Sequence, residues 1–255
     1  PVFCNDLGIA KGLWYSLFHS ISAFCNAGFD LFGIKEPFSS LTFYHSNIYL
    51  NIIIMLLIIT GGIGFLVWGD IRTHKNRIRR FSLQSKVVLM TSAVLIVLPA
   101  LYFFFYEYDH ETIHDRTIHS LFQSVTTRTA GFNTTDLAAM DESGTAIMII
   151  LMLIGGSPGS TAGGMKTATF AVLFLSAITV LRRRNDVQCF KRRISNEAVC
   201  SAGAVLFMYL VLFFTGGIII SRVENLPLLT CLFETSSAIG TVGLTLGITS
   251  GLSAV

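Results

Sequence analysis

The chain has 255 residues, of which 52% are hydrophobic and only 13% carry a charged side chain, and its mean hydropathy is +0.66. An ordinary soluble domain has about 25% charged residues, so this composition excludes one and indicates an integral membrane protein. The five cysteines form no CxxC or other ligand spacing, which favours buried thiols over disulfides or a metal site.

The first expected helix covers residues 12–24, which are too few to cross about 30 Å of hydrocarbon. It is interpreted as a half-membrane helix that ends at the turn Asn26-Ala27-Gly28. His19 lies on it, where helix packing or an interfacial position is favoured over a proton relay. Residues 47–69 predict a full membrane span, whose glycines favour close helix contact or a bend: Gly61, Gly62 and Gly64.

Charge alternates along the chain in a way that predicts its orientation. Residues 70–86 carry six basic side chains against the single acid Asp70, and by the positive-inside rule such a short connector stays in the cytoplasm. A nucleic-acid patch is disfavoured because membrane spans flank this connector. A second basic connector contains Arg182, Arg183, Arg184, Lys191, Arg192 and Arg193. An external mouth that concentrates cations is expected at Glu107, Asp109, Glu111, Asp115, Asp136, Asp141 and Glu142.

Two further pairs of a span and a half-helix follow. Residues 87–105 return outward, with a kink expected at Pro99, and residues 117–128 form the second half-helix before Thr129-Ala130-Gly131. Arg128 is expected to brace this turn by hydrogen bonds to carbonyls. Residues 198–220 span outward again, and residues 226–239 form the third half-helix before Gly240-Thr241-Val242-Gly243.

The long apolar run over residues 145–181 is interrupted in its middle. As one helix it would reach some 55 Å, nearly twice the hydrocarbon thickness. Non-helical backbone at membrane depth persists only where protein or a watery cavity covers it, so a loop below a pore is predicted. Its gating residues are expected to be Gly155, Gly156, Ser157, Pro158, Gly159, Ser160, Thr161, Ala162, Gly163, Gly164 and Lys166.

Two questions about this loop follow from its residues. A nucleotide-binding loop of the GxxxxGK[ST] type is disfavoured, because Met165 stands where the lysine belongs and no strand precedes the loop. Lys166 has two equally weighted interpretations: it holds the loop shut by occupying the cation pathway, or its side chain extends to the cytoplasmic interface.

The three turns are copies of one pattern, in which a glycine follows a polar and small pair and precedes a large apolar residue. The first and third copies align without a gap, and the second needs a gap of one residue between Phe122 and Gly131. Such repeats predict one pore-lining unit used several times. Rings of backbone carbonyls replace the hydration shell of a cation, and the expected filter carbonyls belong to Asn26, Ala27, Gly28, Thr129, Ala130, Gly131, Thr241, Val242 and Gly243.

Other functional classes are less consistent with these residues. No Ser/His/Asp, paired-carboxylate or Cys/His arrangement emerges, so no enzyme is expected. An ion-coupled secondary transporter also uses broken helices and stays as the alternative, although such proteins usually carry acids inside their spans.

With these residues in view, the chain resembles the KtrB/TrkH/HKT superfamily of potassium-uptake proteins, and KtrB most. The resemblance is carried by SAFCNAGFDLFG (22–33), SVTTRTAGFNTTDL (124–137), GGSPGSTAGGMKTATF (155–170) and ETSSAIGTVGLTLGIT (234–249). It implies an all-α integral membrane fold of tandem units, each with a membrane helix (M1), a pore loop (P) and a second membrane helix (M2), around a central ion pore. One M2 helix would be broken by the Gly-rich intramembrane loop.

The same resemblance implies a division of the chain and a function. Residues 1–72 would be the pore loop and M2 of repeat two, residues 73–184 repeat three, and residues 185–255 M1 and the pore loop of repeat four, with the first repeat and the last M2 absent. The implied function is uptake of K⁺ across the bacterial plasma membrane, with Na⁺ dependence open. The family's filter glycines match Gly28, Gly131 and Gly243, and its gating loop matches residues 155–164. The implied partners are a second copy of the protein and a cytoplasmic KtrA/TrkA-type ring, through which alone a nucleotide acts.

Overall fold

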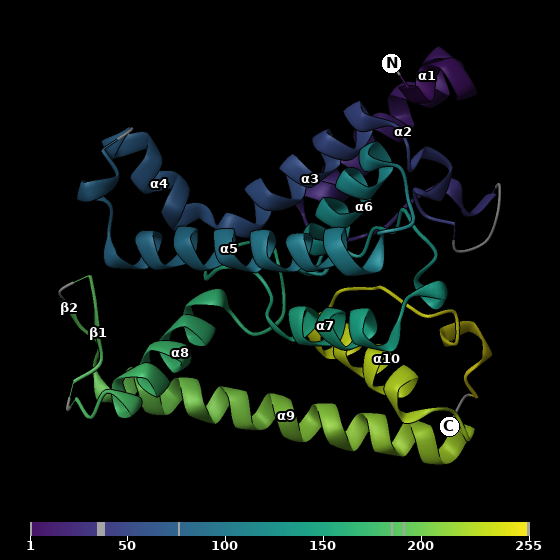
Figure 1. Cartoon of the computed structure of the whole chain (residues 1–255). Coiled ribbons are helices and arrows are strands. Elements are labelled where there is room, and N and C mark those ends of the chain that lie inside the picture. Colours follow the sequence, from purple (N-terminus) through teal and green to yellow (C-terminus); the bar gives the residue numbers. More distant parts are fainter. Residues whose placement is uncertain (1, 35–38, 76, 185, 191, 254–255) are drawn as a thin grey trace.

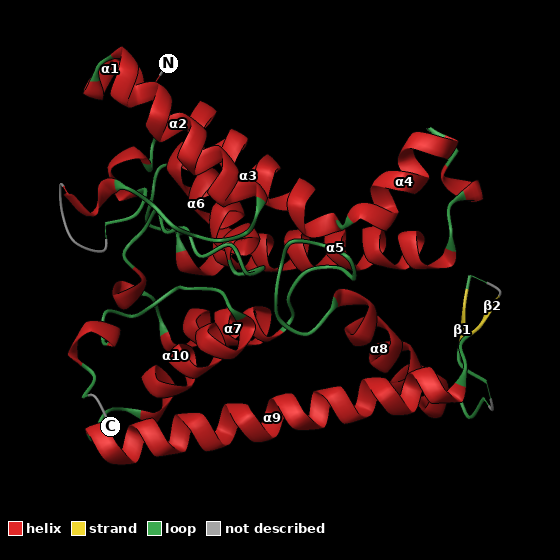
Figure 2. Cartoon of the chain, turned by 180° about the vertical axis from the view of Figure 1, so that it is seen from behind, coloured by secondary structure: helices red, strands yellow, loops and turns green. Residues whose placement is uncertain are grey.

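The computed structural model describes residues 2–34, 39–75, 77–184, 186–190 and 192–253, and these are mostly helical (Figure 1). Its helices are α1 (Val2–Leu7), α2 (Ile9–Phe24), α3 (Ile48–Ile63), α4 (Phe65–His74), α5 (Leu83–Tyr102), α6 (Ile113–Thr126), α7 (Glu142–Leu153), α8 (Thr167–Leu181), α9 (Asn196–Glu224) and α10 (Leu228–Gly240). A short antiparallel hairpin pairs β1 (Gln188–Cys189) with β2 (Arg192–Arg193). The hairpin lies between α8 and α9 (Figure 2), and an isolated bridge joins Ile154 to Met165.

Among the described residues, two helices are each long and apolar enough to cross a membrane, and α3 and α4 pass the same test when taken together. One is α5 together with the π-helical turn Phe103–Glu107 that continues it through residue 107, and the other is α9. Figure 1 shows α7, α8 and α10 between these two long helices. Large apolar side chains such as Phe207, Phe214 and Ile219 are exposed on α9, as lipid-facing residues would be. The multi-pass membrane fold expected from composition is therefore confirmed.

The span expected over residues 47–69 is broken by a bend, which is one of the two roles expected for its glycines. The chain bends by 93° between α3 and α4, and the second helix continues to His74. Gly64 forms the bend with φ 93° and ψ 150°, a conformation that glycine adopts at low cost. A Cβ there would lie 2.8 Å from the carbonyl oxygen of Pro158, so the Gly-rich loop occupies the space that a straight α3 would need.

The three expected half-helices are confirmed with shifted ends. They are α2, α6 and α10, and in each the residue at or just after the end of the helix has a left-handed backbone: Asn26, Thr129 and Thr241. Thr112 caps the start of α6 by accepting a hydrogen bond from the amide of Asp115. The long run over residues 145–181 is divided, as expected, into α7 and α8.

Two hydrophobic cores hold these half-helices. The first gathers residues from α2, α3 and α6, among them Ala23, Ile58 and Phe122, and it includes Ala130 and Phe132 of the second turn. The second gathers residues from α5, α7, α9 and α10, and it includes Val242 and Leu244 of the third turn. The second and third turns are thus fixed to packed side chains.

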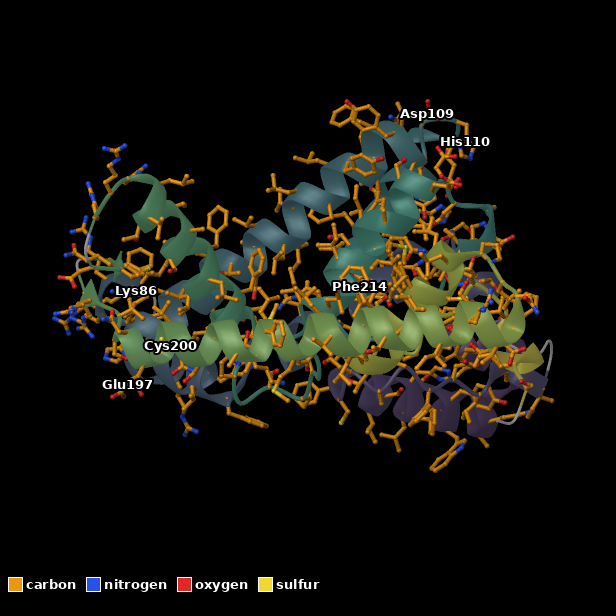
Figure 3. The ribbon with its side chains drawn as sticks, turned by 90° about the horizontal axis from the view of Figure 1, so that it is seen from below. Lys86, Asp109, His110, Glu197, Cys200 and Phe214 are labelled. Atoms are coloured by element: carbon orange, nitrogen blue, oxygen red, sulfur yellow. The ribbon has the colours of Figure 1, made fainter. Side chains whose placement is uncertain are left out.

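The two ends of the molecule differ in charge (Figure 3). Lys86 and Glu197 lie at one end, Asp109 and His110 at the other, and Phe214 lies on α9 between them. The basic connectors and the acidic segment are therefore at opposite ends, as the expected orientation requires. Lys191 of the second connector lies outside the described residues.

The cysteines are all free, which agrees with the expectation of no disulfides. The expectation of buried thiols is wrong for two of them, because Cys25 and Cys200 are exposed and only Cys231 is buried. A cysteine in an apolar stretch of a membrane protein can face lipid or pack inside the protein. The sequence pattern therefore does not distinguish exposed cysteines from buried ones.

Close packing of α9 against α10 gives a first prediction. A Cβ at Gly217 would lie 2.5 Å from Cδ2 of Leu232, whereas nothing lies within 4 Å of a Cβ at Gly203 on the same helix. We expect Gly217→Val to destabilise the detergent-solubilised protein by about 1–3 kcal/mol, the usual effect of overpacking, and Gly203→Val to leave its thermal midpoint unchanged. Fluorescence-detected gel filtration after heating measures both, and equal midpoints would contradict the packing described.

Candidate functional site

The three glycine turns, which are far apart in sequence, meet at one place. A Cβ at Gly28 would lie 2.5 Å from the carbonyl oxygen of Ala130, and a Cβ at Gly131 would lie 2.1 Å from that of Val242. The side-chain amide of Asn26 also donates to the carbonyl of Arg128 at 3.3 Å. The structure therefore brings together the residues that the repeat pattern selected, with the backbones of adjacent turns in direct contact.

The three turns share one backbone conformation. The residue two positions before each glycine and the glycine itself both have positive φ: Asn26 51° and Gly28 71°, Thr129 61° and Gly131 78°, Thr241 55° and Gly243 90°. The residue between them does not, so left-handed and ordinary conformations alternate. A positive φ is uncommon for a β-branched residue such as threonine, and such strain persists only where the surroundings impose it. The alternation allows consecutive carbonyls to face one side, as a ring of ion ligands requires.

Each turn also stands at the C-terminal end of a half-helix. Unpaired carbonyls at a helix C-terminus carry a partial negative charge of roughly half an electron. Because α2, α6 and α10 end at the place where the turns meet, their three negative ends converge there. Electrostatically, this arrangement favours a cation and disfavours an anion.

A cavity of about 270 Å³ opens beside the turns. It is lined by the three glycines Gly28, Gly131 and Gly243 together with the two acids Asp30 and Asp136. Each acid also orders the backbone beside it, since Asp30 accepts from the amide of Phe32 at 2.8 Å and Asp136 from that of Ala138 at 3.0 Å. The cavity offers cations an acidic approach to the turns.

The loop over residues 155–166 is closed on itself by backbone hydrogen bonds. The amide of Gly155 donates to the carbonyl of Met165 at 2.8 Å, and that of Gly156 to Gly163 at 3.3 Å. The two limbs approach so closely that a Cβ at Gly155 would lie 2.0 Å from the carbonyl oxygen of Gly163. Only glycine permits this crossing, which explains the composition of the loop.

The same loop contacts the left-handed residue of every turn. The hydroxyl of Thr161 lies 3.0 Å from Oδ1 of Asn26, and the amide of Gly163 donates to Oγ1 of Thr129 at 3.2 Å. A Cβ at Gly163 would lie 1.8 Å from Oγ1 of Thr241. The loop therefore packs directly against the place where the three turns meet.

Backbone hydrogen bonds also join the loop to the bend between α3 and α4. The amides of Ser157 and Thr161 donate to the carbonyls of Gly62 and Gly61 at 3.0 and 3.4 Å, and the amide of Phe65 donates to Gly159 at 3.0 Å. These bonds satisfy carbonyls at the end of α3 and an amide at the start of α4 that a helix break leaves unpaired. The sequence predicted a close helix contact or a bend at Gly61, Gly62 and Gly64, but it did not predict that these residues bind the loop.

Two basic side chains near the site differ from what the sequence suggested. The Lys166 ammonium donates to the carbonyl of Ala162 at 2.6 Å, a contact inside the loop that neither interpretation of this residue included. The guanidinium of Arg128 is buried and donates to the hydroxyl of Ser92 on α5 at 3.1 Å. The expected bracing of turn carbonyls by this guanidinium is therefore wrong, since its partner belongs to a neighbouring helix that approaches only in the fold.

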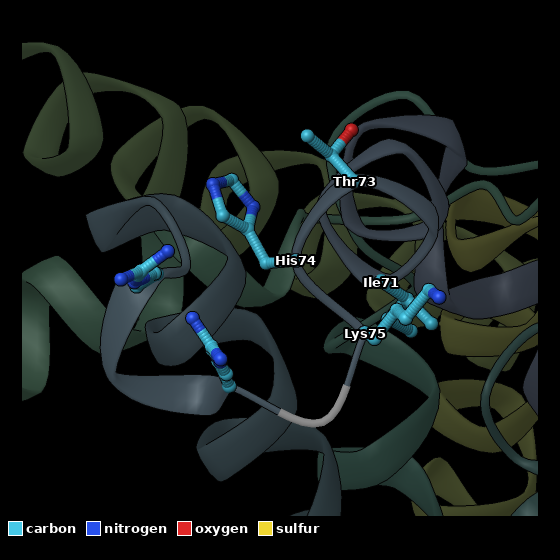
Figure 4. Close-up of a pocket in the computed structure, with 6 residues that line it drawn as sticks. Ile71, Thr73, His74 and Lys75 are labelled. Atoms are coloured by element: carbon cyan, nitrogen blue, oxygen red, sulfur yellow. The ribbon is translucent and has the colours of Figure 1, made fainter.

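At the basic end of the molecule, a pocket of about 750 Å³ lies beside the end of α4 (Figure 4). It is lined by Ile71, Thr73, His74, Lys75, Arg77 and Arg80. The first basic connector thus forms an open, positively charged surface that suits acidic groups.

Comparison with known proteins agrees with this geometry. The sequence model of the TrkH family, described as "Cation transport protein", matches residues 5–255. The chain is 38% identical to the potassium/sodium uptake protein NtpJ of Enterococcus hirae, with 100% of the chain and 57% of that protein aligned. It is 40% identical to the Ktr system potassium uptake protein B of Bacillus subtilis, with 96% and 55% aligned.

A solved structure supports the fold. The potassium transporter TrkH from Vibrio parahaemolyticus superposes with a TM-score of 0.74 at 19% identity, covering 94% of this chain and 52% of that one. The chain spans just over half the length of the relatives it matches. These relatives are described as transport proteins and not as enzymes, and they confirm the resemblance carried by the four motifs. The chain belongs to the TrkH family of cation transport proteins.

Proposed function

We propose that this chain lines the pathway for K⁺ uptake through a membrane transporter. The filter would be formed by backbone carbonyls of residues 26–28, 129–131 and 241–243. The observation that carries the proposal is the meeting of three identically folded turns at their glycines, with the ends of three half-helices behind them. Backbone carbonyls in such a ring replace the water around a cation without adding a charged group that would bind it too tightly.

The loop over residues 155–164, with Lys166 beside it, would gate this pathway. Its contacts with Asn26, Thr129 and Thr241 support the proposal, because a loop in this place obstructs passage beyond the turns. Residues 155–164 are held by hydrogen bonds and contribute no side chain to the two hydrophobic cores, so they can move without unfolding the helices around them.

The chain would correspond to the pore loop and M2 of repeat two (1–72), repeat three (73–184), and M1 and pore loop of repeat four (185–255). In the membrane, the basic connectors would face the cytoplasm and the acidic segment the outside. The relatives include a "Ktr system" protein and a "potassium/sodium" uptake protein by name, which supports a system of several components and Na⁺ dependence. We propose in addition a homodimer that docks on a cytoplasmic nucleotide-binding KtrA/TrkA-type ring. The proposal needs no covalently bound cofactor.

Rubidium uptake tests the proposal. The full-length parent protein, expressed with its regulatory subunit in bacteria that lack K⁺ uptake systems, should accumulate radioactive rubidium in a saturable manner. Unlabelled K⁺ should compete more strongly than Na⁺. Cells with an empty vector provide the control, and uptake no greater than theirs, despite protein in the membrane, would refute the proposed function.

Broken helices at mid-membrane depth also occur in ion-coupled transporters, and the α3–α4 and α7–α8 breaks keep that alternative in view. Current recordings from reconstituted protein separate the two. A current whose reversal potential equals the K⁺ equilibrium potential supports a pore. A reversal potential that is displaced by the gradient of a second ion, in a fixed stoichiometry, supports a carrier.

A further inference from the structure

The residue that follows the buried or half-buried phenylalanine of each half-helix occupies an equivalent position in the three repeats. These residues are His19 on α2, Gln123 on α6 and Glu234 on α10. All three are buried although they are polar. A polar side chain buried at the same position of all three repeats indicates that the three have a common structural role.

That task is visible in their hydrogen bonds. Nε2 of His19 accepts from the amide of Leu31 at 3.3 Å, and Nε2 of Gln123 donates to the hydroxyl of Thr135. Oε1 of Glu234 accepts from the amide of Leu246 at 2.9 Å. Each partner lies three or four residues after the glycine of its own turn. The equivalent side chain therefore ties the segment that leaves the turn back to the half-helix that leads into it.

Glu234 accepts further hydrogen bonds from the segment that follows its turn. Its Oε1 also accepts from the hydroxyl of Thr245 at 2.6 Å, and its Oε2 accepts from that of Thr249 at 2.8 Å. Among the described residues it is the one buried carboxylate, and no basic side chain of the described residues forms a salt bridge with it. Three donors therefore hold this carboxylate in one position. Its negative charge is thus held in place and left unneutralised.

The segment tied to Glu234 borders the cation approach. Thr245 and Leu246 line the same cavity as Gly243, Gly131 and Gly28. A charge buried beside such a cavity is screened less than one in water and acts on ions within it. Of the other two acids at this cavity, Asp30 is only partly buried and Asp136 is exposed, so solvent weakens the effect of both charges.

We propose that Glu234 is a positioning residue whose fixed negative charge sets the cation affinity of the pathway at the third turn. The proposal deepens the proposed function and rests on it. The carboxylate of Glu234 does not coordinate the ion. It holds the segment 245–249 in position by hydrogen bonds, and its negative charge attracts cations in the cavity. The ligand class is a monovalent cation at the entrance to the turns.

Paired substitutions separate charge from shape. Glutamine at position 234 removes the charge but keeps the three contacts, since its carbonyl accepts from Thr245 and Leu246 and its amide donates to the Thr249 hydroxyl. Aspartate keeps the charge but is too short to keep every contact. For rubidium uptake by the full-length protein, we expect Glu234→Gln to raise the half-saturation concentration on the order of threefold to tenfold. Its maximal rate should stay near that of wild type, and Glu234→Asp should raise the half-saturation concentration less.

Glu224→Gln is the matched control, because Glu224 lies partly exposed at the end of α9, accepts from the amide of Ser253 and does not line the cavity. We expect it to leave both constants unchanged. The proposal is overturned if Glu234→Gln matches wild type, or if Glu234→Asp is impaired as much as or more than Glu234→Gln. It is also overturned if Glu234→Gln fails to reach the membrane while Glu234→Asp transports normally, since the charge then serves assembly. A wild-type protein without uptake would refute the proposed function itself, which is a separate result.

Discussion

Gly131→Ser is expected to weaken the apparent affinity for K⁺ by about tenfold or more, equivalent to about 1.4 kcal/mol, and to reduce discrimination against Na⁺. A Cβ at this position would lie 2.1 Å from the carbonyl oxygen of Val242, and the backbone has φ 78°. The new side chain must therefore displace a carbonyl of the next turn, and the ring of ligands loses its shape. Rubidium uptake with K⁺ and Na⁺ as competitors, in the full-length protein, measures both effects.

The control for this variant is Gly8→Ser. Gly8 also has a positive φ, 80°, but nothing lies within 4 Å of a Cβ there. It therefore carries the backbone strain of the substitution without a clash between turns, and transport should match wild type. If Gly131→Ser transports with unchanged affinity and selectivity, Gly131 is a packing residue and the carbonyl filter is wrong.

Gly163→Val is expected to increase the maximal uptake rate severalfold and to reduce its dependence on a cytoplasmic regulatory subunit. The Cβ alone would lie 1.8 Å from Oγ1 of Thr241, so either the loop or the third turn must move. Val242 and Leu244 fix the turn in a hydrophobic core, whereas residues 155–164 contribute no side chain to that core. We therefore expect the loop to move and the half-saturation concentration to change little.

Gly159→Ala provides the comparison within the same loop. Gly159 also has a positive φ, 72°, but the nearest atom to a Cβ there is Cγ of Leu66 at 4.0 Å. Its uptake rate should stay close to that of wild type. A Gly163→Val protein that reaches the membrane but shows unchanged or slower uptake would argue against a gating role for this loop.

Local sequence pattern was enough to find the turns and the loop. The half-helices are too short for a membrane span, and the glycines that end them recur in a fixed context, so both features follow from length and repetition. The interruption between α7 and α8 follows in the same way, because glycine and proline cannot continue a helix. These features depend on residues close together in the chain.

The features that sequence analysis missed depend on contacts between distant segments. The glycines indicated a contact or a bend at residues 61–64, but no local pattern links the 93° bend at Gly64 to the loop residues Pro158 and Gly159 that pack against it. The partner of Arg128 is Ser92, a serine in an apolar helix that carries no signal of its own. The hydrogen bond from Leu246 to Glu234 could have been anticipated by comparing the equivalent positions His19, Gln123 and Glu234 of the three repeats.

The contacts among the turns also bear on how such a chain can change over generations. Gly28 abuts the backbone of Ala130, and Gly131 abuts that of Val242, so neighbouring turns recognise main chain and not side chain. The other residues of the turns can therefore differ. The three turns read Asn-Ala-Gly, Thr-Ala-Gly and Thr-Val-Gly, yet all have positive φ at the first residue and at the glycine. After duplication, each unit is free to acquire its own lipid contacts and partners, while natural selection retains the one glycine in its turn.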